Sequence, residues 1–489
     1  MKIRTLKSNS IRIAALGLLV FFSGCVANPV TGKKQLTLMS EQQEIALGAE
    51  SDPQIIAQFG LYDNEALQKF IDLHGQEMAR ISHRPNLKYQ FRILDSPVVN
   101  AFAVPGGYVY FTRGIMAHFN DEAQFAGVLG HEIGHIAAKH SVEQFTKQTV
   151  AQVLFIGGLL VSKELRTFAD QAQTAMGLLF LKYSRDNESQ SDELGVEYST
   201  KVGYDAKEMA DFFKTLKSLS AESGAEIPTF LSTHPDPADR YERVGKLAAE
   251  AKVKYPMPSY KINRDSYLDM IDGIIYGEDP QQGYVESDVF YHPGLKFLFP
   301  VPQQWQLANS PSQVQMVPEN GKALILFTLV EGNSLQTAAT NTANELKLTV
   351  TSSRQITVNG LQALEVLSGQ VTQDPGTGQQ SSINVKSVYI QYGGNIYVFH
   401  GVSTTADFSS YTSYFDKTMY GFKELKDQAK INVKPERINV VAVKQSGTLA
   451  QALGAYNVPT ARQKELAVVN GMELTSLVTA GSKIKVLTK

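Results

Sequence analysis

The stretch His131-Glu132-Ile133-Gly134-His135 decides how the first half of this 489-residue chain is interpreted. It lies in a segment with helical periodicity, for which Asn120 is the expected N-cap. Residues four apart share one face of a helix, so His131 and His135 point the same way and can bind one metal ion. Neutral imidazole suits zinc. Glu132, beside that face, is placed to take a proton from a water bound to the metal.

A catalytic zinc ion needs a third protein ligand, and no further histidine follows His135 at a suitable spacing. The segment 187–192, Asn-Glu-Ser-Gln-Ser-Asp, supplies carboxylates instead. Glu188 and Asp192 are four residues apart in a helical pattern, so both share a face. We expect Glu188 to complete the coordination. Asp192 can accept the outward N–H of a ligating histidine, with His131 as the preferred candidate.

Three motifs together carry a family resemblance. His-Glu-Ile-Gly-His at 131–135, Asn-Glu-x-x-x-Asp at 187–192 and His-Pro-x-x-x-x-Arg at 234–240 resemble the CAAX-processing and HtpX/BepA-like metallopeptidases, which are gluzincins. The resemblance covers about residues 41–255 and implies an α-rich, zincin-like α+β peptidase domain. It implies one Zn2+ per chain, with the ligands and the base named above.

The same resemblance implies roles for three further residues. Asp192 would be the second acid, often described as the proton donor, although we prefer the orienting role for it. His234 and Arg240 would lie close to the zinc ion, where they stabilise the oxyanion of a tetrahedral intermediate. Alternatively, His234 is a fourth ligand that holds the site shut.

An extended stretch precedes the metal-binding motif, at residues 89–94 and 98–112, with Pro105-Gly106-Gly107 as a turn. Its segment from Asn100 to Tyr108 is similar to the strand that holds extended substrate in the same family. A peptide added to a sheet edge is bound through its backbone, whatever its side chains. We therefore expect Asn100, Ala101 and Phe102 to bind unfolded polypeptide chains with broad specificity.

The first 24 residues have the pattern of an export signal, with four basic residues before an apolar run that ends in Ser23-Gly24-Cys25. The run of about ten residues is too short to span a bilayer, which takes roughly 20. Its end resembles a bacterial lipobox, from which Phe22 departs, so we expect Cys25 to be lipidated rather than incidental to a secretory signal. Val26 after it favours sorting to the outer membrane from the periplasmic side.

Composition excludes several classes of function. The net charge is −2, from 46 basic and 48 acidic residues, so no overall field would attract nucleic acid. Cys25 is the only cysteine, which excludes an internal disulfide and a thiolate zinc site. Two apolar runs, 150–161 and 175–181, are too short to span a membrane, and we expect core helices or a mobile helical loop over the site. His140 is five residues after His135 and is expected to point away from the metal site. It and the other remaining histidines are expected to be structural: His74, His83, His118, His140, His292 and His400.

The rest of the chain predicts two further domains. Alternating apolar and polar residues, with helical pieces near 336–348 and 406–421, predict a second α+β domain with no catalytic spacing. The last stretch has a strand-helix-helix-strand order, with Gly447-Thr448-Leu449 before its first helix, and resembles LysM-type modules that bind peptidoglycan glycans. Gly447 replaces the usual Asp, which puts glycan binding in doubt.

The expected organisation of this multidomain chain is a signal peptide (1–24), a lipidated Cys with its tether (25–40), a peptidase domain (41–255), a connector (256–284), an α+β domain (285–428) and a βααβ LysM-like domain (436–489). These features predict a periplasmic, lipid-anchored zinc endopeptidase that hydrolyses unfolded or misassembled envelope proteins. The alternative is an envelope assembly or chaperone factor that binds client chains, with proteolysis secondary or suppressed.

Overall fold

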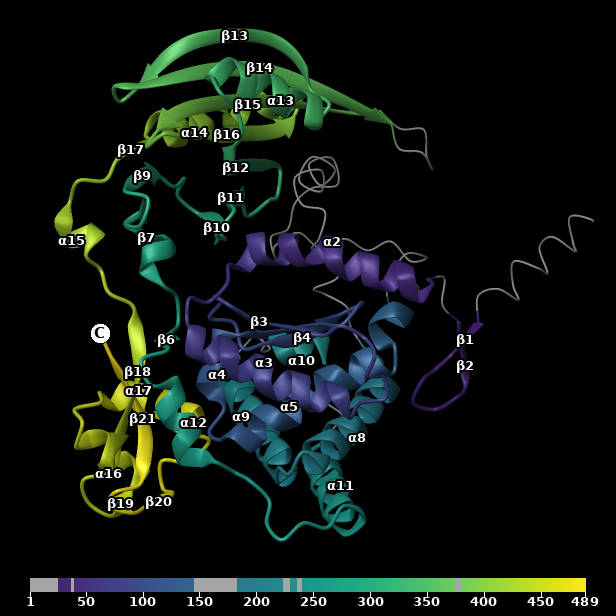
Figure 1. Ribbon diagram of the computed structural model, residues 1–489. Helices are drawn as coiled ribbons and strands as arrows, with labels where there is room; N and C mark the ends of the chain where they lie inside the picture. Colours follow the sequence, from purple (N-terminus) through teal and green to yellow (C-terminus); the bar gives the residue numbers. More distant parts are fainter. Residues whose placement is uncertain (1–24, 37–38, 145–182, 223–228, 235–239, 374–379) are drawn as a thin grey trace, which may run out of the picture.

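The computed structural model describes residues 25–36, 39–144, 183–222, 229–234, 240–373 and 380–489. Figure 1 shows a helical region, a sheet-rich region above it and a small C-terminal unit beside it. Among the described residues, no helix is both long enough and apolar enough to cross a bilayer. The apolar runs 150–161 and 175–181 lie outside the described residues.

The helical region surrounds a small sheet. Its helices are α2 (Glu41–Phe59), α3 (Glu65–Arg80), α4 (Arg113–His118), α5 (Glu122–Ala137), α8 (Arg185–Lys201), α9 (Lys207–Glu222), α10 (Thr229–Thr233), α11 (Arg240–Lys254) and α12 (Arg264–Ile271). The sheet has the order β3 (Gln90–Leu94), β5 (Tyr108–Thr112), β4 (Ala101–Val104), with β4 antiparallel at one edge. The extended stretch expected from the sequence is therefore confirmed.

Helix α5 is the centre of this region, and all of its residues are buried. Its N-cap is Asp121, whose side chain accepts a hydrogen bond from the Gln124 backbone N–H at 2.8 Å. The expected N-cap, Asn120, is one residue too early. A Cβ on Gly130 would lie 2.9 Å from the Gly195 carbonyl oxygen of α8, so only glycine allows these helices to pack this closely. The close packing sets the two histidines of α5 opposite the carboxylates of α8.

The stretch expected to be a tether contains a small hairpin of β1 (Cys25–Ala27) and β2 (Lys34–Leu36). Asn28, at its turn, is buried. Its Nδ2 donates a hydrogen bond at 3.0 Å to the carbonyl of Ala138, the C-cap of α5. The N-terminal segment is thus attached to the end of the metal-binding helix.

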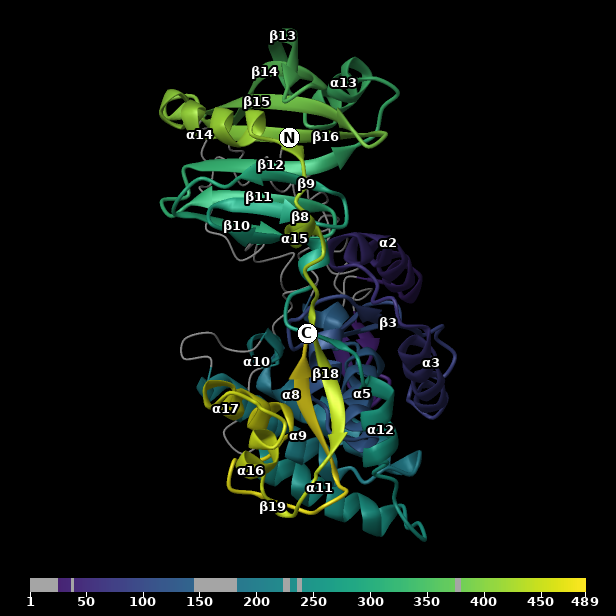
Figure 2. The ribbon, with the colours of Figure 1, turned by 90° about the vertical axis from the view of Figure 1, so that its left-hand side faces the viewer.

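The sheet-rich region is a seven-stranded antiparallel sheet with a helix on each face (Figure 2). On β16, adjacent residues point to opposite faces. Val398 packs in a cluster with Ala338 of α13, whereas Phe399 packs in a cluster with Phe415 of α14. The strand order is β10 (Trp305–Asn309), β11 (Gln313–Pro318), β12 (Ala323–Val330), β16 (Asn395–Thr404), β15 (Gln380–Tyr392), β14 (Leu361–Gln373), β13 (Thr349–Val358), and the helices are α13 (Leu335–Glu345) and α14 (Phe408–Tyr420).

Short elements connect this sheet to the rest of the chain. A four-stranded sheet has the order β17 (Lys423–Glu424), β9 (Phe297–Pro300), β8 (Val289–His292), β7 (Tyr284–Glu286). The 3-10 turn η2 (Pro280–Gln282) precedes it, and α15 (Gln428–Ile431) follows it. The helices predicted near 336–348 and 406–421 are confirmed by α13 and α14.

The C-terminal unit has the expected strand-helix-helix-strand order, in β18 (Glu436–Ala442), α16 (Leu449–Gly454), α17 (Thr460–Val469) and β21 (Lys483–Thr488). Two further short strands, β19 (Gly447–Thr448) and β20 (Leu477–Val478), pair with each other, and β6 (Ile275–Tyr276) of the connector pairs with β18.

The C-terminal unit shares a core with the helical region. Ile438 and Leu453 belong to the same buried cluster as Phe119. Lys485 is fully buried, and its Nζ donates hydrogen bonds of 2.9 Å to the carbonyls of Ala117 and Phe119. The unit is therefore built into the wall of the helical region.

Candidate metal centre

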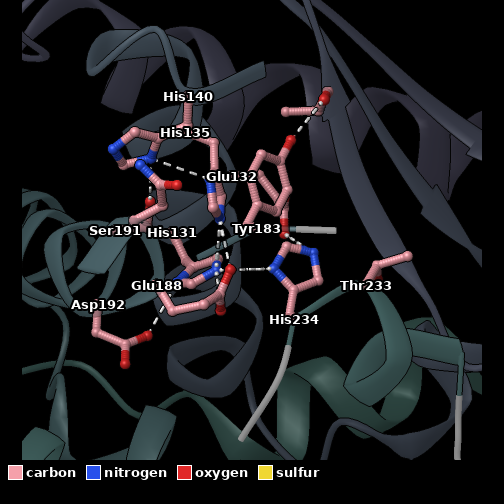
Figure 3. A network of polar contacts seen from close by, with 12 residues as sticks. His131, Glu132, His135, His140, Tyr183, Glu188, Ser191, Asp192, Thr233 and His234 are labelled. Atoms are coloured by element: carbon pink, nitrogen blue, oxygen red, sulfur yellow. Dashed lines mark hydrogen bonds and ion pairs between the residues drawn. The ribbon is translucent and has the colours of Figure 1, made fainter. Parts of the chain in front are cut away.

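Four side chains from three segments converge at the centre of the helical region (Figure 3). His131 and His135 lie one turn apart on α5, and their Nε2 atoms are 3.0 Å apart. Nδ1 of His234, which follows α10, lies 3.3 Å from Nε2 of His131 and 3.0 Å from Oε1 of Glu188 in α8. All four are buried, and one potential ligand atom of each lies within 4.8 Å of the others. These four residues, His131, His135, Glu188 and His234, are called the metal group below. The structure thus brings together the three predicted ligands and His234.

The chemistry of this group fits zinc. Burial lowers the pKa of His135 well below its ordinary value, so the ring is neutral, as a ligand must be. Burial alone would raise the pKa of Glu188, but His234 and Arg240 outweigh it and hold the pKa well below its usual range. Among the described residues, Oε2 of Glu188 is buried and accepts no hydrogen bond, although Nη2 of Arg240 lies 3.2 Å from it as an ion-pair partner. Histidine nitrogens with one carboxylate form a donor set that zinc prefers.

Asp192 holds the outer nitrogen of the first ligand. Its Oδ1 lies 2.9 Å from Nδ1 of His131, the contact expected from the sequence. Arg240 donates to Asp192 through Nε at 2.9 Å and Nη2 at 2.6 Å, and its Nη2 lies 3.2 Å from Oε2 of Glu188. Burial alone would raise the pKa of Asp192, but Arg240 and His131 lower it. An ionised Asp192 engaged in this way is suited to orienting His131.

His140 holds the outer nitrogen of the second ligand, a role that the sequence did not reveal. Its Nδ1 lies 3.1 Å from Nδ1 of His135, and its Nε2 lies 2.9 Å from Oε1 of Gln190. With Nε2 of His135 directed at the metal group, His135 donates through Nδ1–H, and His140 donates in turn to Gln190. The prediction that His140 points elsewhere is wrong because Lys139, with φ of 59°, reverses the chain after α5.

Glu132 is placed to act as a base. Both of its carboxylate oxygens are buried, and neither has a hydrogen-bond partner among the described residues. Its Oε1 lies 3.7 Å from Nε2 of His234. Burial raises the pKa of Glu132 towards the range in which a general base works best. A buried carboxylate without hydrogen bonds is unfavourable for folding, so its presence here indicates a chemical role.

The edge strand β4 borders the metal group. Thr112 N–H donates to the Asn100 carbonyl at 3.0 Å. Because antiparallel partners alternate between paired and outward-facing residues, Phe102 also pairs with β5, and Ala101 faces the free edge. The backbone contact to substrate that was predicted for Asn100 and Phe102 is thus already used within the sheet. Asn100 offers its side chain instead, because its buried Oδ1 has no partner among the described residues.

Comparisons with known proteins agree with this geometry. Residues 65–248 match the model of Peptidase family M48. The chain is 29% identical over 218 residues to "Mitochondrial metalloendopeptidase OMA1" of Arabidopsis thaliana, covering 44% of this chain and 42% of that protein. It is 29% identical over 186 residues to "Putative beta-barrel assembly-enhancing protease" of Vibrio cholerae serotype O1, covering 36% of this chain and 38% of that protein.

The match covers less than half the length of either relative. Among solved structures, cyanobacterial PsbP from Synechocystis sp. PCC 6803 aligns with this chain at 10% sequence identity and a TM-score of 0.22. The alignment covers 29% of this chain and 91% of the PsbP chain. The family match spans the helices that hold the metal group. Residues 65–248 therefore form a peptidase domain of family M48, the zinc-dependent metallopeptidases of the HtpX/BepA-like kind.

Proposed function

We propose that this protein is a zinc endopeptidase of the periplasm that hydrolyses peptide bonds in unfolded or misassembled envelope proteins. The observation that carries the proposal is the buried group of His131, His135 and Glu188 beside Glu132, whose carboxylate has no hydrogen-bond partner among the described residues. A ligand group and a free base so close together fit hydrolysis and have no evident structural use.

Each residue of the site has a part in the reaction. His131, His135 and Glu188 would hold the ion, which when bound lowers the pKa of water and polarises a carbonyl. Glu132 takes the proton of the attacking water and passes it to the leaving amine. Asp192 and His140 keep the two ligand rings in the required tautomer and orientation. His234, whose Nδ1 lies 3.3 Å from Nε2 of His131, would donate a hydrogen bond to the developing oxyanion.

The edge strand supports an unfolded polypeptide as substrate, because β4 offers backbone groups rather than a side-chain pocket. Two relatives carry names that refer to the assembly of β-barrels, "Putative beta-barrel assembly-enhancing protease" of Vibrio cholerae and "Beta-barrel assembly-enhancing protease" of Escherichia coli. Envelope proteins are therefore the substrates that we propose for this chain.

The N-terminal residues are the basis for the location that we propose. Export and lipidation of Cys25 would attach the chain to the periplasmic face of the outer membrane, three residues before the buried Asn28. The C-terminal unit has the strand and helix order of a LysM-like module, so peptidoglycan is a further partner that we propose for it.

The test is purification of the full chain, zinc analysis, and digestion of casein by wild type and by Glu132→Gln. We expect about one zinc per chain in both proteins and cleavage by the wild type alone. Chains that bind no zinc, or a wild type that holds zinc and cleaves nothing, would contradict the proposal.

One observation favours the alternative of an assembly or chaperone factor with suppressed proteolysis. Nδ1 of His234 lies 3.0 Å from Oε1 of Glu188, so the metal group contains four potential ligands rather than three. A fourth ligand would occupy the position that a catalytic zinc keeps open. His234→Ala should raise casein cleavage if His234 closes the site, and lower it if His234 stabilises the oxyanion. The chaperone alternative requires suppression of aggregation by wild type and Glu132→Gln alike.

A further inference from the structure

At the free edge of β4, the outward carbonyl of one residue already accepts hydrogen bonds, whereas the outward N–H and C=O of another residue have no hydrogen-bond partner among the described residues. Ala101 and Ala103 are the residues of β4 whose N–H and C=O face away from β5. Ala101 is fully buried, and its outward N–H and C=O have no hydrogen-bond partner among the described residues. Buried backbone groups without partners are rare in folded proteins. The pair at Ala101 therefore marks a place where another backbone belongs.

The Ala103 carbonyl is occupied by two hydroxyl groups of the chain itself. Ser141 Oγ donates to it at 3.0 Å and Tyr183 Oη donates to it at 3.3 Å. The two hydroxyls are also within hydrogen-bond distance of each other, at 2.9 Å. They take the place that the N–H of an added strand would need.

The ring of Tyr183 fixes this arrangement relative to the metal group. It stacks on the ring of His135 with centroids 3.9 Å apart and an angle of 27° (Figure 3). At the other end of the edge, the Val99 carbonyl accepts a hydrogen bond from the Phe230 backbone N–H at 3.2 Å. Ala101 lies between these two closed ends.

We propose that an extended substrate pairs with β4 at Ala101, and that the hydroxyls of Ser141 and Tyr183 end this pairing at Ala103. Since Tyr183 also packs against His135, the end of the pairing is held at a fixed place relative to the metal. The pair thus sets the register of the substrate and limits how many of its residues are bound. Because Ala101 is fully buried, a substrate must displace the groups that cover it in order to pair there.

This inference rests on the proposed function and adds which residues decide the length of bound substrate. The test uses the purified, zinc-loaded full chain and two series of peptides with one cleavable bond. One series is lengthened residue by residue at its N-terminus and the other at its C-terminus. The readout is the dependence of kcat/KM on length, which does not depend on the absolute activity of a variant.

In the wild type, we expect kcat/KM to reach a plateau in both series. In the double variant Ser141→Ala/Tyr183→Phe, kcat/KM in one of the two series should continue to rise with peptide length, to about five-fold above the wild-type plateau. The rise should come from a lower KM. A five-fold change corresponds to about 1 kcal/mol, because a factor of ten corresponds to about 1.4 kcal/mol. This is the net contribution of about one further hydrogen bond. Tyr183→Phe keeps the ring on His135, so zinc content should not change. The matched variant Tyr183→Leu loses the ring and should lose zinc to a chelator at a lower concentration.

A double variant with full zinc and the wild-type length dependence would overturn the inference. An equal rise in both series would also overturn it, because it would indicate general loosening of the site. A zinc-loaded wild type that cleaves no peptide in either series would contradict the proposed function itself, and this inference with it.

Discussion

Two buried groups of charged side chains, one in the sheet-rich region and one in the helical region, are satisfied in opposite ways. Glu365 on β14 accepts a hydrogen bond from Arg354 Nε at 2.6 Å and lies 3.1 Å from Nζ of Lys386. Lys386 also donates to Asp416 at 2.5 Å. In the metal centre, the two buried oxygens of Glu132 have no hydrogen-bond partner among the described residues.

This difference separates a cluster that supports the fold from one that serves chemistry. In the sheet-rich region, each charge is matched by an opposite one, so the cluster is understood from stability alone. In the metal centre, the folded chain retains a buried carboxylate that costs several kcal/mol when unpaired. We therefore expect substitutions at the two places to affect different quantities.

The largest expected effect is on catalysis. Glu132→Gln should lower kcat/KM for an unfolded substrate by about 10²- to 10⁴-fold, because it removes the group that takes up the proton. Thermal unfolding should occur at the same or a higher temperature, since a neutral amide loses less on burial than a carboxylate. Peptide cleavage and calorimetry on the same preparation check both statements. A large loss of stability would place Glu132 with the structural cluster.

The next largest effect is on stability. Lys386→Met should destabilise the sheet-rich region by about 1–3 kcal/mol, because Glu365 and Asp416 lose the lysine that they share, while Arg354 still donates to Glu365. Trp305, the only tryptophan, lies on β10 of this sheet, so its fluorescence in urea reports on this region. Cleavage per zinc-loaded chain should not change. A shift in activity with no shift in the urea midpoint would reverse the distinction between the two clusters.

A smaller effect is expected where a side chain supports a ligand without touching the metal. His140→Ala should lower zinc affinity about 10- to 100-fold, because His135 loses the partner that fixes its ring. Competition with a chelator measures this change. His400→Ala is the matched control, since this buried histidine of the sheet-rich region bonds Ser387 at 2.8 Å, far from the metal group along the chain. Equal zinc affinity in both variants would contradict the positioning role.

The smallest effect is a dependence on pH. Burial alone would raise the pKa of Glu365, but hydrogen bonds from Arg354, Tyr420 and Lys386 outweigh it and lower the pKa to about 2. The unfolded value is about 4.3, so the contribution of Glu365 is present above that pH and is lost as pH falls towards 2. The stability difference between wild type and Glu365→Gln, followed by Trp305 fluorescence, should shrink between about pH 4 and pH 2. A constant difference would contradict this assignment.

That His131, His135 and Glu188 come together could be predicted from the sequence, because their spacing is a local property of two helices. Residues four apart on α5 and on α8 share a face whatever the rest of the fold does. The contact of Asp192 with His131 followed from the same rule. The helices α13 and α14 were predicted equally well, because their apolar periodicity is also local.

Other features depend on the backbone and could not be predicted. His140 meets His135 because the chain reverses at Lys139, which no spacing rule encodes. The register between β4 and β5 decides which residues of β4 direct their N–H and C=O to the free edge. A shift of the register by one residue would exchange the roles of Ala101 and Phe102. The attachment of the C-terminal unit depends on Lys485, whose partners are main-chain carbonyls without any sequence signature.

The burial of Lys485 bears on how this protein can be divided and recombined. Its amine donates to two carbonyls at the end of α4, just before the catalytic helix begins, and burial lowers its pKa well below the ordinary value. A peptidase shortened to end before residue 436 would therefore expose an apolar wall and two unpaired carbonyls. Exchange of this unit for another by recombination would require that wall to be rebuilt as well.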